Sequence, residues 1–324
     1  MLYRSAASAS LRRLLAVSAT ISMGGLAAAA LHHLLQNVSY RGLIDSLAAM
    51  SSWVIVGALA ATAVDFVVLS ANDFAALHYA RAAPPIAATL LASFCGYAIG
   101  NFIGFAALSG GAVRYRVYSA VGVPPPKIAR ITVYIATAFG IGAAATIGFG
   151  LALRAHEVAR LYGIPYESLR LIAVLLLAGT AALLTACAFG RKSFRLGRGT
   201  IELPSPGLIF VQIGATMIDI VVASGTLWVL LPASSIDFVT FVVIFTAALS
   251  LGILSHAPAG IGVFDAAVVY AIGTRGSPNA VAAALITFRA IYFLLPFSIA
   301  SVLLAASELR RWLRRRPASA DNAR

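Results

Sequence analysis

Six charged residues lie in stretches of the sequence that are otherwise apolar, and these positions are where we expect chemistry. The acids are Asp65, Asp219 and Asp265, and the bases are Arg114, Arg116 and Arg289. A charge near the centre of a bilayer costs at least about 2.5–3.5 kcal/mol unless it is paired or hydrated. Because three acids stand against three bases, electroneutrality predicts that they converge on one polar interior. The alternative is a set of structural ion pairs that hold helices together.

The segment Ser109-Gly110-Gly111 is predicted to begin a short helix that binds an anion. Such a start leaves backbone N–H groups unpaired, and together with Arg114 and Arg116 in the first two turns they suit a phosphate group. Positions two apart on a helix are separated by about 200°, so only one arginine is expected to face the site. We favour Arg114 and expect Arg116 to reach the membrane interface.

A second interrupted segment, Pro258–Asp265, contains Gly260 and Gly262 and leads into another predicted helix start. Asp265 in its first turn favours a cation or a proton over an anion. Segments broken by Gly or Pro are tolerated at membrane depth only where protein or a water-filled cavity surrounds them. The alternative for both segments is a loop followed by an amphipathic helix at the interface.

The composition identifies the class of protein. Of the 324 residues, 60% are hydrophobic and 11% are charged, which excludes a soluble globular chain. Backbone groups in lipid must be satisfied within helices, so the long apolar stretches predict membrane spans of about 20 residues each. The first stretch could also be a cleaved signal peptide, but we favour a retained helix. The stretches are 14–31, 52–71, 86–108, 128–153, 169–189, 206–231, 237–255 and 280–306.

The charge balance and the missing motifs narrow the function. With 24 Lys and Arg against 11 Asp and Glu, the net charge of +13 favours cytoplasmic loops and anionic lipid headgroups over nucleic acid. Cys95 and Cys187 lie in apolar runs and are expected to be buried hydrophobic residues. No phosphate-binding P-loop, nucleophile elbow, CxxC pair or zinc-binding HExxH motif occurs in the sequence. We therefore predict no catalytic residue, cofactor or metal, and a protein that is not an enzyme.

An internal repeat predicts the architecture. The run ATAVDFVVLSA at 61–71 matches ATMIDIVVASG at 215–225 at six of eleven positions, and Asp65 aligns with Asp219. The two interrupted segments follow in the same order, and Ile131-Thr132 then aligns with Ile286-Thr287. We expect one transmembrane domain over 1–310 and a basic cytoplasmic tail over 311–324. Within the domain the parts are repeat one at 46–153, a connecting helix at 169–189 and repeat two at 200–308.

The positive-inside rule predicts the orientation of the repeats. When each interrupted segment counts as one passage, the basic loops fall on the cytoplasmic side together with both termini. The two repeats then run in opposite directions, as in many secondary transporters, with a site near the middle of the membrane. The sequence thus predicts an all-α polytopic membrane protein, with about eight transmembrane helices and two re-entrant half-helices in an inverted repeat.

The runs GNFIGFAALSGGAVRYRVYSAVG at 100–122 and SHAPAGIGVFDAAVV at 255–269 resemble a known membrane family. It is the membrane domain of the aminoacyl-phosphatidylglycerol synthase and flippase (multiple peptide resistance factor) family, also called the lysylphosphatidylglycerol synthetase membrane region. The resemblance covers essentially all of 10–310 and places Asp65, Arg114 and Asp219 on the family's polar core positions. Ala259 and Asp265 depart from the family's usual Gly and Glu. The chain ends at Arg324, so a synthase domain is not expected in it.

The resemblance implies a flippase that moves aminoacylated phosphatidylglycerol, such as lysyl-phosphatidylglycerol, between leaflets of the bacterial inner membrane. In this hypothesis Arg114, Gly110 and Gly111 hold the phosphate, while Asp65 and Asp219 hold ammonium groups. One alternative is a scaffold for a separate lipid-modifying enzyme, and another is a flippase for a different phosphate-containing glycolipid. The expected partners are anionic and aminoacylated phospholipids, with a separately encoded lipid synthase and a homo-oligomer as further candidates.

Overall fold

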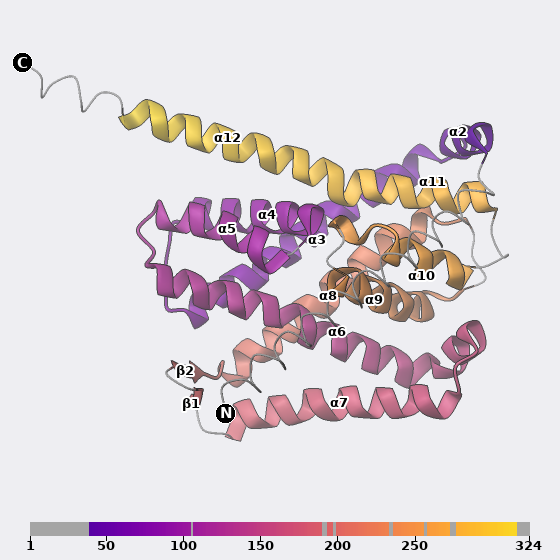
Figure 1. Cartoon of the computed structure of the whole chain (residues 1–324), viewed down its shortest axis with the longest axis horizontal. Helices are drawn as coiled ribbons and strands as arrows, with labels where there is room; N and C mark the ends of the chain where they lie inside the picture. Colours follow the sequence, from indigo (N-terminus) through magenta and orange to yellow (C-terminus); the bar gives the residue numbers. More distant parts are fainter. Residues whose placement is uncertain are drawn as a thin grey trace, which may run out of the picture. The chain divides into compact units, whose positions relative to one another are not determined.

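The computed structural model describes residues 39–104, 106–189, 193–196, 199–232, 236–255, 258–272 and 277–315 (Figure 1). The chain is an all-α polytopic membrane protein, and the described residues include six helices long and apolar enough to span a bilayer. The predicted first span, 14–31, lies outside the described residues.

The elements follow one another with clear local signals at several boundaries. Proline occupies the first position of three helices, where its missing N–H has no partner to lose. Asp237 caps another helix by accepting a hydrogen bond from the Thr240 N–H at 3.1 Å. The elements are α2 (Tyr40–Ala48), α3 (Ser52–Tyr79), α4 (Ile86–Ile103), α5 (Ala106–Ser119), α6 (Pro125–Tyr162), α7 (Tyr166–Phe189), β1 (Ser193–Leu196), β2 (Gly199–Glu202), α8 (Pro206–Leu230), α9 (Phe238–Leu254), η1 (Pro258–Gly260), α10 (Val263–Ile272), α11 (Pro278–Phe288), η3 (Arg289–Leu294) and α12 (Leu295–Arg315).

Several boundaries differ from the prediction; α6, for example, runs over Pro125–Tyr162 instead of 128–153. Three further differences follow. The stretch predicted as one helix over 86–108 is broken at Gly104, which has φ +83°, a conformation that favours glycine. The helix α3 continues to Tyr79 instead of ending at residue 71, because Asn72 and Asp73 are accommodated within it. The basic segment near residue 195 contains an antiparallel hairpin of β1 and β2, in which Phe194 pairs with Ile201.

The order of elements is the same in the two predicted repeats. A long helix, α3 or α8, is followed by a shorter one, α4 or α9, then by a break and a short helix, α5 or α10. Each series ends in a long helical segment, Pro125–Tyr162 or Pro278–Arg311. The connecting helix is α7. The inverted relation of the two repeats stays a prediction.

The helices form two compact units, each built from three separate stretches of the chain. Of the described residues, one unit takes those within 1–58, 143–180 and 224–287, and the other takes those within 59–142, 181–223 and 288–324. The first includes α9, η1 and α10. The second includes α4, α5, η3, α12 and most of α3, and we call it the Asp65 unit.

In the Asp65 unit, α4 and α5 form a tight antiparallel hairpin (Figure 1). Glycines allow the two backbones to meet: a Cβ atom added at Gly110 would lie 2.6 Å from the Gly96 carbonyl oxygen. One added at Gly100 would lie 3.3 Å from the Ala106 carbonyl oxygen. Small residues four positions apart on α4 are the usual means of close helix packing in membranes.

The two ends of this hairpin return to the same place. Lys127, just inside α6, donates a hydrogen bond from Nζ to the carbonyl oxygen of Arg81, which precedes α4, at 2.5 Å. The chain therefore enters α4 and leaves α5 close to its starting point. Because α4 and α5 run in opposite directions, this arrangement agrees with the positive-inside argument, which counts the interrupted segment containing Gly110 as one passage.

The other unit contains a smaller hairpin of α9 and α10 that is also joined through glycine. A Cβ atom added at Gly252 of α9 would lie 3.2 Å from the Cα atom of Gly260. Gly260 and Gly262 have φ +65° and +89°, values that side-chain-bearing residues rarely adopt. This turn places the start of α10 directly against α9.

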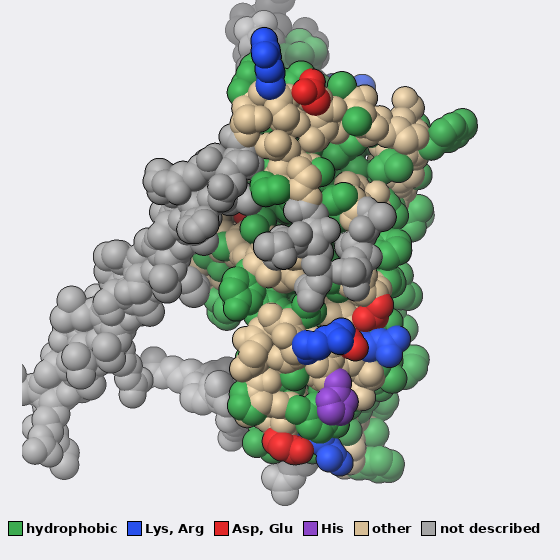
Figure 2. Space-filling view, turned by 90° about the vertical axis from the view of Figure 1, so that its right-hand side faces the viewer, with side chains coloured by type: hydrophobic (Ala, Val, Ile, Leu, Met, Phe, Trp, Pro, Cys, Tyr) green, Lys and Arg blue, Asp and Glu red, His purple; other side chains and the backbone are tan. Residues whose placement is uncertain are grey.

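Many large hydrophobic side chains point outward, as expected of a surface that faces lipid. Trp53 and Val67 on α3 are 83% and 72% exposed, and Phe210 on α8 is 71% exposed. On the face drawn in Figure 2, charged side chains occur in a few groups, and hydrophobic and other uncharged side chains make up most of the rest. Buried positions are mostly hydrophobic as well, but they include several polar and charged residues, which are costly at membrane depth.

We predict that replacing Gly110 with alanine forces α4 and α5 apart and destabilises the protein by about 1–3 kcal/mol, the usual range for overpacking. Gly140→Ala is the matched control, because nothing lies within 4 Å of a Cβ atom added there. Thermal unfolding in detergent measures both. Equal midpoints for the two variants would contradict the close contact at Gly110.

Candidate functional site

A buried ion pair lies at the centre of the Asp65 unit. Arg114 of α5 donates from Nε to Asp73 Oδ1 at 2.9 Å and from Nη2 to Asp73 Oδ2 at 2.8 Å. The two side chains are 3% and 0% exposed. Such a two-pronged contact fixes the planar guanidinium group in orientation as well as in position.

Two tyrosines complete the surroundings of this pair. Tyr118 donates its hydroxyl to Asp73 Oδ1 at 3.4 Å, one turn beyond Arg114 on α5. The Tyr97 ring of α4 lies 4.6 Å from the Arg114 Cζ atom, a cation–π arrangement. The side of the guanidinium away from Asp73 rests against glycine: a Cβ atom added at Gly96 would lie 2.9 Å from Arg114 Nη1. The glycines of the α4–α5 hairpin therefore also make room for this side chain.

The repeat-related acids Asp65 and Asp219 meet within the same unit. Their carboxyl groups lie within hydrogen-bonding reach of each other, and the side chains are 0% and 8% exposed. Tyr292 donates its hydroxyl to Asp65 Oδ2 at 2.5 Å. Two acids on different helices thus share one buried position.

Tyr292 reaches Asp65 from an unusual stretch of helix. Residues Arg289–Leu294 form a π-helix, η3, between α11 and α12. Pro296 lies two residues after Leu294, at the second position of α12, and has no N–H to donate to the turn before it, so the regular hydrogen-bond ladder is interrupted here. Single π-helical turns of this kind are frequent at functional sites.

The buried charges of this unit do not balance. Asp65, Asp73 and Asp219 are three buried acids, and Arg114 is the one buried base among the described residues of the unit, which leaves a formal charge of −2. The ion pair and the acid pair share α3, on which Asp65 and Asp73 lie about two helical turns apart. We call Asp65, Asp73, Tyr97, Arg114, Tyr118, Asp219 and Tyr292 the acidic cluster.

Three buried polar atoms of this unit take part in no hydrogen bond with a described residue. They are Asp65 Oδ1, Asn72 Oδ1 and Thr216 Oγ1. The Asp65 and Asn72 oxygens can only accept hydrogen bonds, and the Thr216 hydroxyl lies one helical turn before Asp219. Because buried polar groups without partners are costly, their grouping on α3 and α8 indicates a place for a polar ligand.

The predicted anion site at Gly110 and Gly111 is not formed as expected. The helix α5 begins at Ala106, so both glycines lie inside it and their N–H groups do not mark its start. Ser109 donates its hydroxyl back to the Gly104 carbonyl oxygen at 2.9 Å. The glycines serve helix packing instead, since a Cβ atom at Gly111 would lie 2.8 Å from Thr132 Cγ2 of α6.

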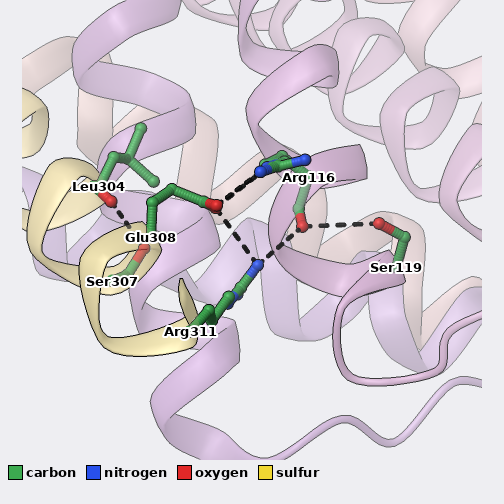
Figure 3. A network of polar contacts seen from close by, with 6 residues as sticks. All are labelled: Arg116, Ser119, Leu304, Ser307, Glu308 and Arg311. Atoms are coloured by element: carbon green, nitrogen blue, oxygen red, sulfur yellow. Dashed lines mark hydrogen bonds and ion pairs between the residues drawn. The ribbon is translucent and has the colours of Figure 1, made fainter. Parts of the chain in front are cut away.

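Arg116 points away from the acidic cluster, as the helical spacing predicted. It pairs with Glu308 of α12, with Nη2 at 2.5 Å from Oε2, and Arg311 Nη1 lies 3.4 Å from Glu308 Oε1 (Figure 3). Arg116 is 67% exposed. The network fastens the end of α5 to α12, but exposed pairs of this kind add little stability.

The remaining predicted residues lie elsewhere. Asp265 accepts a hydrogen bond from the Gly262 N–H at 2.9 Å, so it caps α10 in the unit that contains α9, and Gly260 forms the turn before it. Arg289 stands over the Phe293 ring at 5.9 Å within η3.

Sequence reasoning missed Asp73 and the three tyrosines. Asp73 lies eight residues after Asp65, about two turns along the same helix, so a span drawn to residue 79 would have included it. For Tyr97 and Tyr118, the spacing of the neighbouring residues in the helix gives no signal that either belongs to a site. Tyr292 precedes Pro296 by four residues, which is a recognisable signal of a disturbed helix.

The arrangement favours binding over covalent chemistry. A buried cluster with excess negative charge attracts a positively charged group, and a guanidinium beside it can contact an anion if Asp73 moves away. A ligand that carries both a phosphate and an ammonium group would match both parts of the cluster.

Comparison with known proteins agrees with this membrane architecture. Residues 14–300 match the model of the family described as the lysylphosphatidylglycerol synthase TM region. An uncharacterized protein of Synechocystis, slr0712, is 30% identical over 299 residues, which cover 91% of both chains. The inner membrane protein YbhN of Escherichia coli K12 is 26% identical over 261 residues, covering 79% of this chain and 81% of YbhN.

We predict that Asp73→Ala destabilises the protein by about 3–5 kcal/mol, because it leaves the Arg114 charge buried without its partner. The double variant Asp73→Ala/Arg114→Met is expected to recover most of that loss, since it removes the unpaired charge. Thermal unfolding in detergent compares the two.

Arg116→Met is the control, because it breaks an exposed pair and is expected to change the unfolding midpoint little. A double variant no more stable than Asp73→Ala would show that the unpaired charge is not the cause.

Proposed function

Since the chain belongs to the family of the lysylphosphatidylglycerol synthase transmembrane region, we propose that it is a lipid flippase. Its substrate in this proposal is aminoacylated phosphatidylglycerol, which it moves between leaflets of the bacterial inner membrane. The observation that carries the proposal is the contact of Asp65 with Asp219, buried in membrane helices within the acidic cluster, whose surplus of negative charge they supply.

The acid pair is suited to the cationic part of the headgroup. A lysyl-phosphatidylglycerol headgroup carries ammonium groups, which carboxylates bind through short, charge-assisted hydrogen bonds. Among the described residues, no lysine or arginine forms an ion pair with Asp65 or Asp219. The headgroup would supply the positive charge that the protein itself leaves out.

The phosphate of the same headgroup fits the other half of the cluster. Arg114 has one amino group, Nη1, that makes no hydrogen bond with a described residue, and its other nitrogens contact Asp73. The lipid phosphate would compete with Asp73 for this guanidinium. That competition replaces the predicted helix-start site at Gly110 and Gly111 as the means of phosphate recognition.

We propose that the flippase has both termini in the cytoplasm. The positive-inside count supports this orientation. The basic residues that the count places inside also lie together in pairs: Lys127 contacts the Arg81 carbonyl oxygen, and Arg311 contacts the carbonyl oxygen of Arg116 at 3.5 Å. The Arg116–Glu308–Arg311 network then lies where α5 and α12 reach the inner leaflet (Figure 3).

The first test measures outer-leaflet lipid in cells that make lysyl-phosphatidylglycerol from a separately expressed synthase. A membrane-impermeant amine reagent labels the exposed lipid. Asp65→Asn and Asp219→Asn are each expected to lower exposure by about tenfold, the factor for a lost charge-assisted contact of about 1.4 kcal/mol. Asp237→Asn is the control, because it changes an exposed acid that caps α9.

Unchanged exposure in both variants would remove the acid pair from the mechanism. Purified protein in liposomes decides between transport and scaffolding: a flippase exposes lipid without any partner enzyme, whereas a scaffold does not.

The orientation has its own test. Alkaline phosphatase fused after residue 315 is expected to be inactive, and a fluorescent protein fused there is expected to fluoresce, because both report a cytoplasmic end. Active phosphatase at that position would reverse the proposed orientation.

A further inference from the structure

We propose that Asp65, Asp219 and Thr216 bind one sodium ion when no lipid headgroup occupies them. The proposal concerns the same acid pair as the proposed flippase function, and the ion's role in transport rests on that function. The binding itself can be tested without any aminoacylated lipid.

Buried negative charge favours a cation at this position. Two carboxyl groups in contact, at 0% and 8% exposure, repel each other strongly in a medium of low polarity. Tyr292 contributes one hydroxyl hydrogen bond to Asp65 Oδ2, which offsets part of one charge. Arg114 is held by Asp73 and does not pair with either acid.

The unpartnered atoms indicate where the ion sits. Asp65 Oδ1 has no hydrogen bond with a described residue, although its side chain is fully buried. Thr216 Oγ1 is also unpartnered, at 2% exposure, and lies three residues before Asp219 on the same face of α8. A cation between these oxygens would satisfy both atoms and the facing Asp219 carboxylate together.

The donor set selects the kind of cation. Carboxylate and hydroxyl oxygens suit hard ions, whereas nitrogen and sulfur ligands, which favour transition metals, do not contribute to this set. Calcium takes six to eight oxygen ligands, more than two carboxyl groups and one hydroxyl offer, and magnesium usually keeps several waters in its coordination shell. If the two carboxyl groups share one proton, one negative charge remains on the acid pair. A sodium ion carries the single positive charge that neutralises it.

Exchange of this ion for a lipid headgroup would remove a cost of transport. Moving a lipid of net charge +1 outward against an inside-negative potential costs about 2.3 kcal/mol per 100 mV. If one sodium ion enters for each lipid that leaves, no net charge crosses the membrane. Competition for the same carboxylates is the physical coupling between the two movements.

The experiment measures binding of radioactive sodium to the full chain in nanodiscs of phosphatidylethanolamine, at constant pH and without aminoacylated lipid. Saturable binding is expected, displaced by unlabelled sodium but not by choline. Asp65→Asn is expected to abolish it. Thr216→Val, which keeps the side chain's shape, is expected to raise the half-saturating concentration by about tenfold or more, as losses at metal sites typically do.

Thr185→Val is the matched control, because this exposed hydroxyl of α7 donates only to its own helix at Ala181. Circular dichroism confirms that each variant is folded, and the Thr216 variant decides the matter if Asp65→Asn fails to fold. Three results would overturn the proposal: no saturable sodium binding, equal binding in Thr216→Val and wild type, or displacement by calcium or magnesium at lower concentrations than sodium.

The outcomes separate this proposal from the flippase function. Absent sodium binding with normal lipid exposure refutes the ion site alone, whereas normal sodium binding with no lipid movement in liposomes refutes the flippase alone.

Discussion

Excess negative charge in a buried place is the constraint on which the rest of this structure depends. Three carboxyl groups and one guanidinium lie together in apolar helices, where water cannot dissipate their fields. Asp73 and Arg114 neutralise each other, so the surplus is concentrated on Asp65 and Asp219. A protein can sustain this arrangement only if a positive group from outside, or a proton, completes it.

The close packing of α4 against α5 sets the position of that charge. Gly96 and Gly110 bring the two helices together and leave room for the guanidinium of Arg114 beside the Tyr97 ring. The helix α5 returns to where α4 began, and its far end meets α12 through the Arg116–Glu308 pair. The π-helix η3, which lies just before α12, supplies Tyr292 to Asp65. The hairpin thus connects the inner cluster with the proposed cytoplasmic surface.

Much of the fold followed from composition and periodicity, because lipid leaves the backbone few alternatives to helices. The sequence predicted the positions of most spans, the broken segments and the family. The repeat drew attention to Asp65 and Asp219, which lie together in the structure, and their role in binding stays a prediction. The partner of Arg114 could not be predicted in this way. Asp73 lies at the polar end of an apolar run, and only tertiary packing decides whether α3 continues through it.

The anion site failed for a related reason. Ser109-Gly110-Gly111 has the composition of a helix start, but packing against Gly96 draws it into the helix interior, and the break falls at Gly104 instead. Glycine can either form a turn or allow two helices to pack closely, and the sequence around Gly110 and Gly111 fits both roles. Similarly, η3 depends on Pro296, whose effect on Tyr292 is visible only once α3 lies beside it.

The central claim is that a positive group from the ligand rests between Asp65 and Asp219. The most direct measurement is an experimental structure of the wild-type chain in a membrane that contains lysyl-phosphatidylglycerol. We expect density for an ammonium group in contact with Asp65 Oδ1 and the Asp219 carboxylate, with the lipid phosphate toward Arg114. Density for the headgroup elsewhere, with both carboxyl groups facing acyl chains, would contradict the claim.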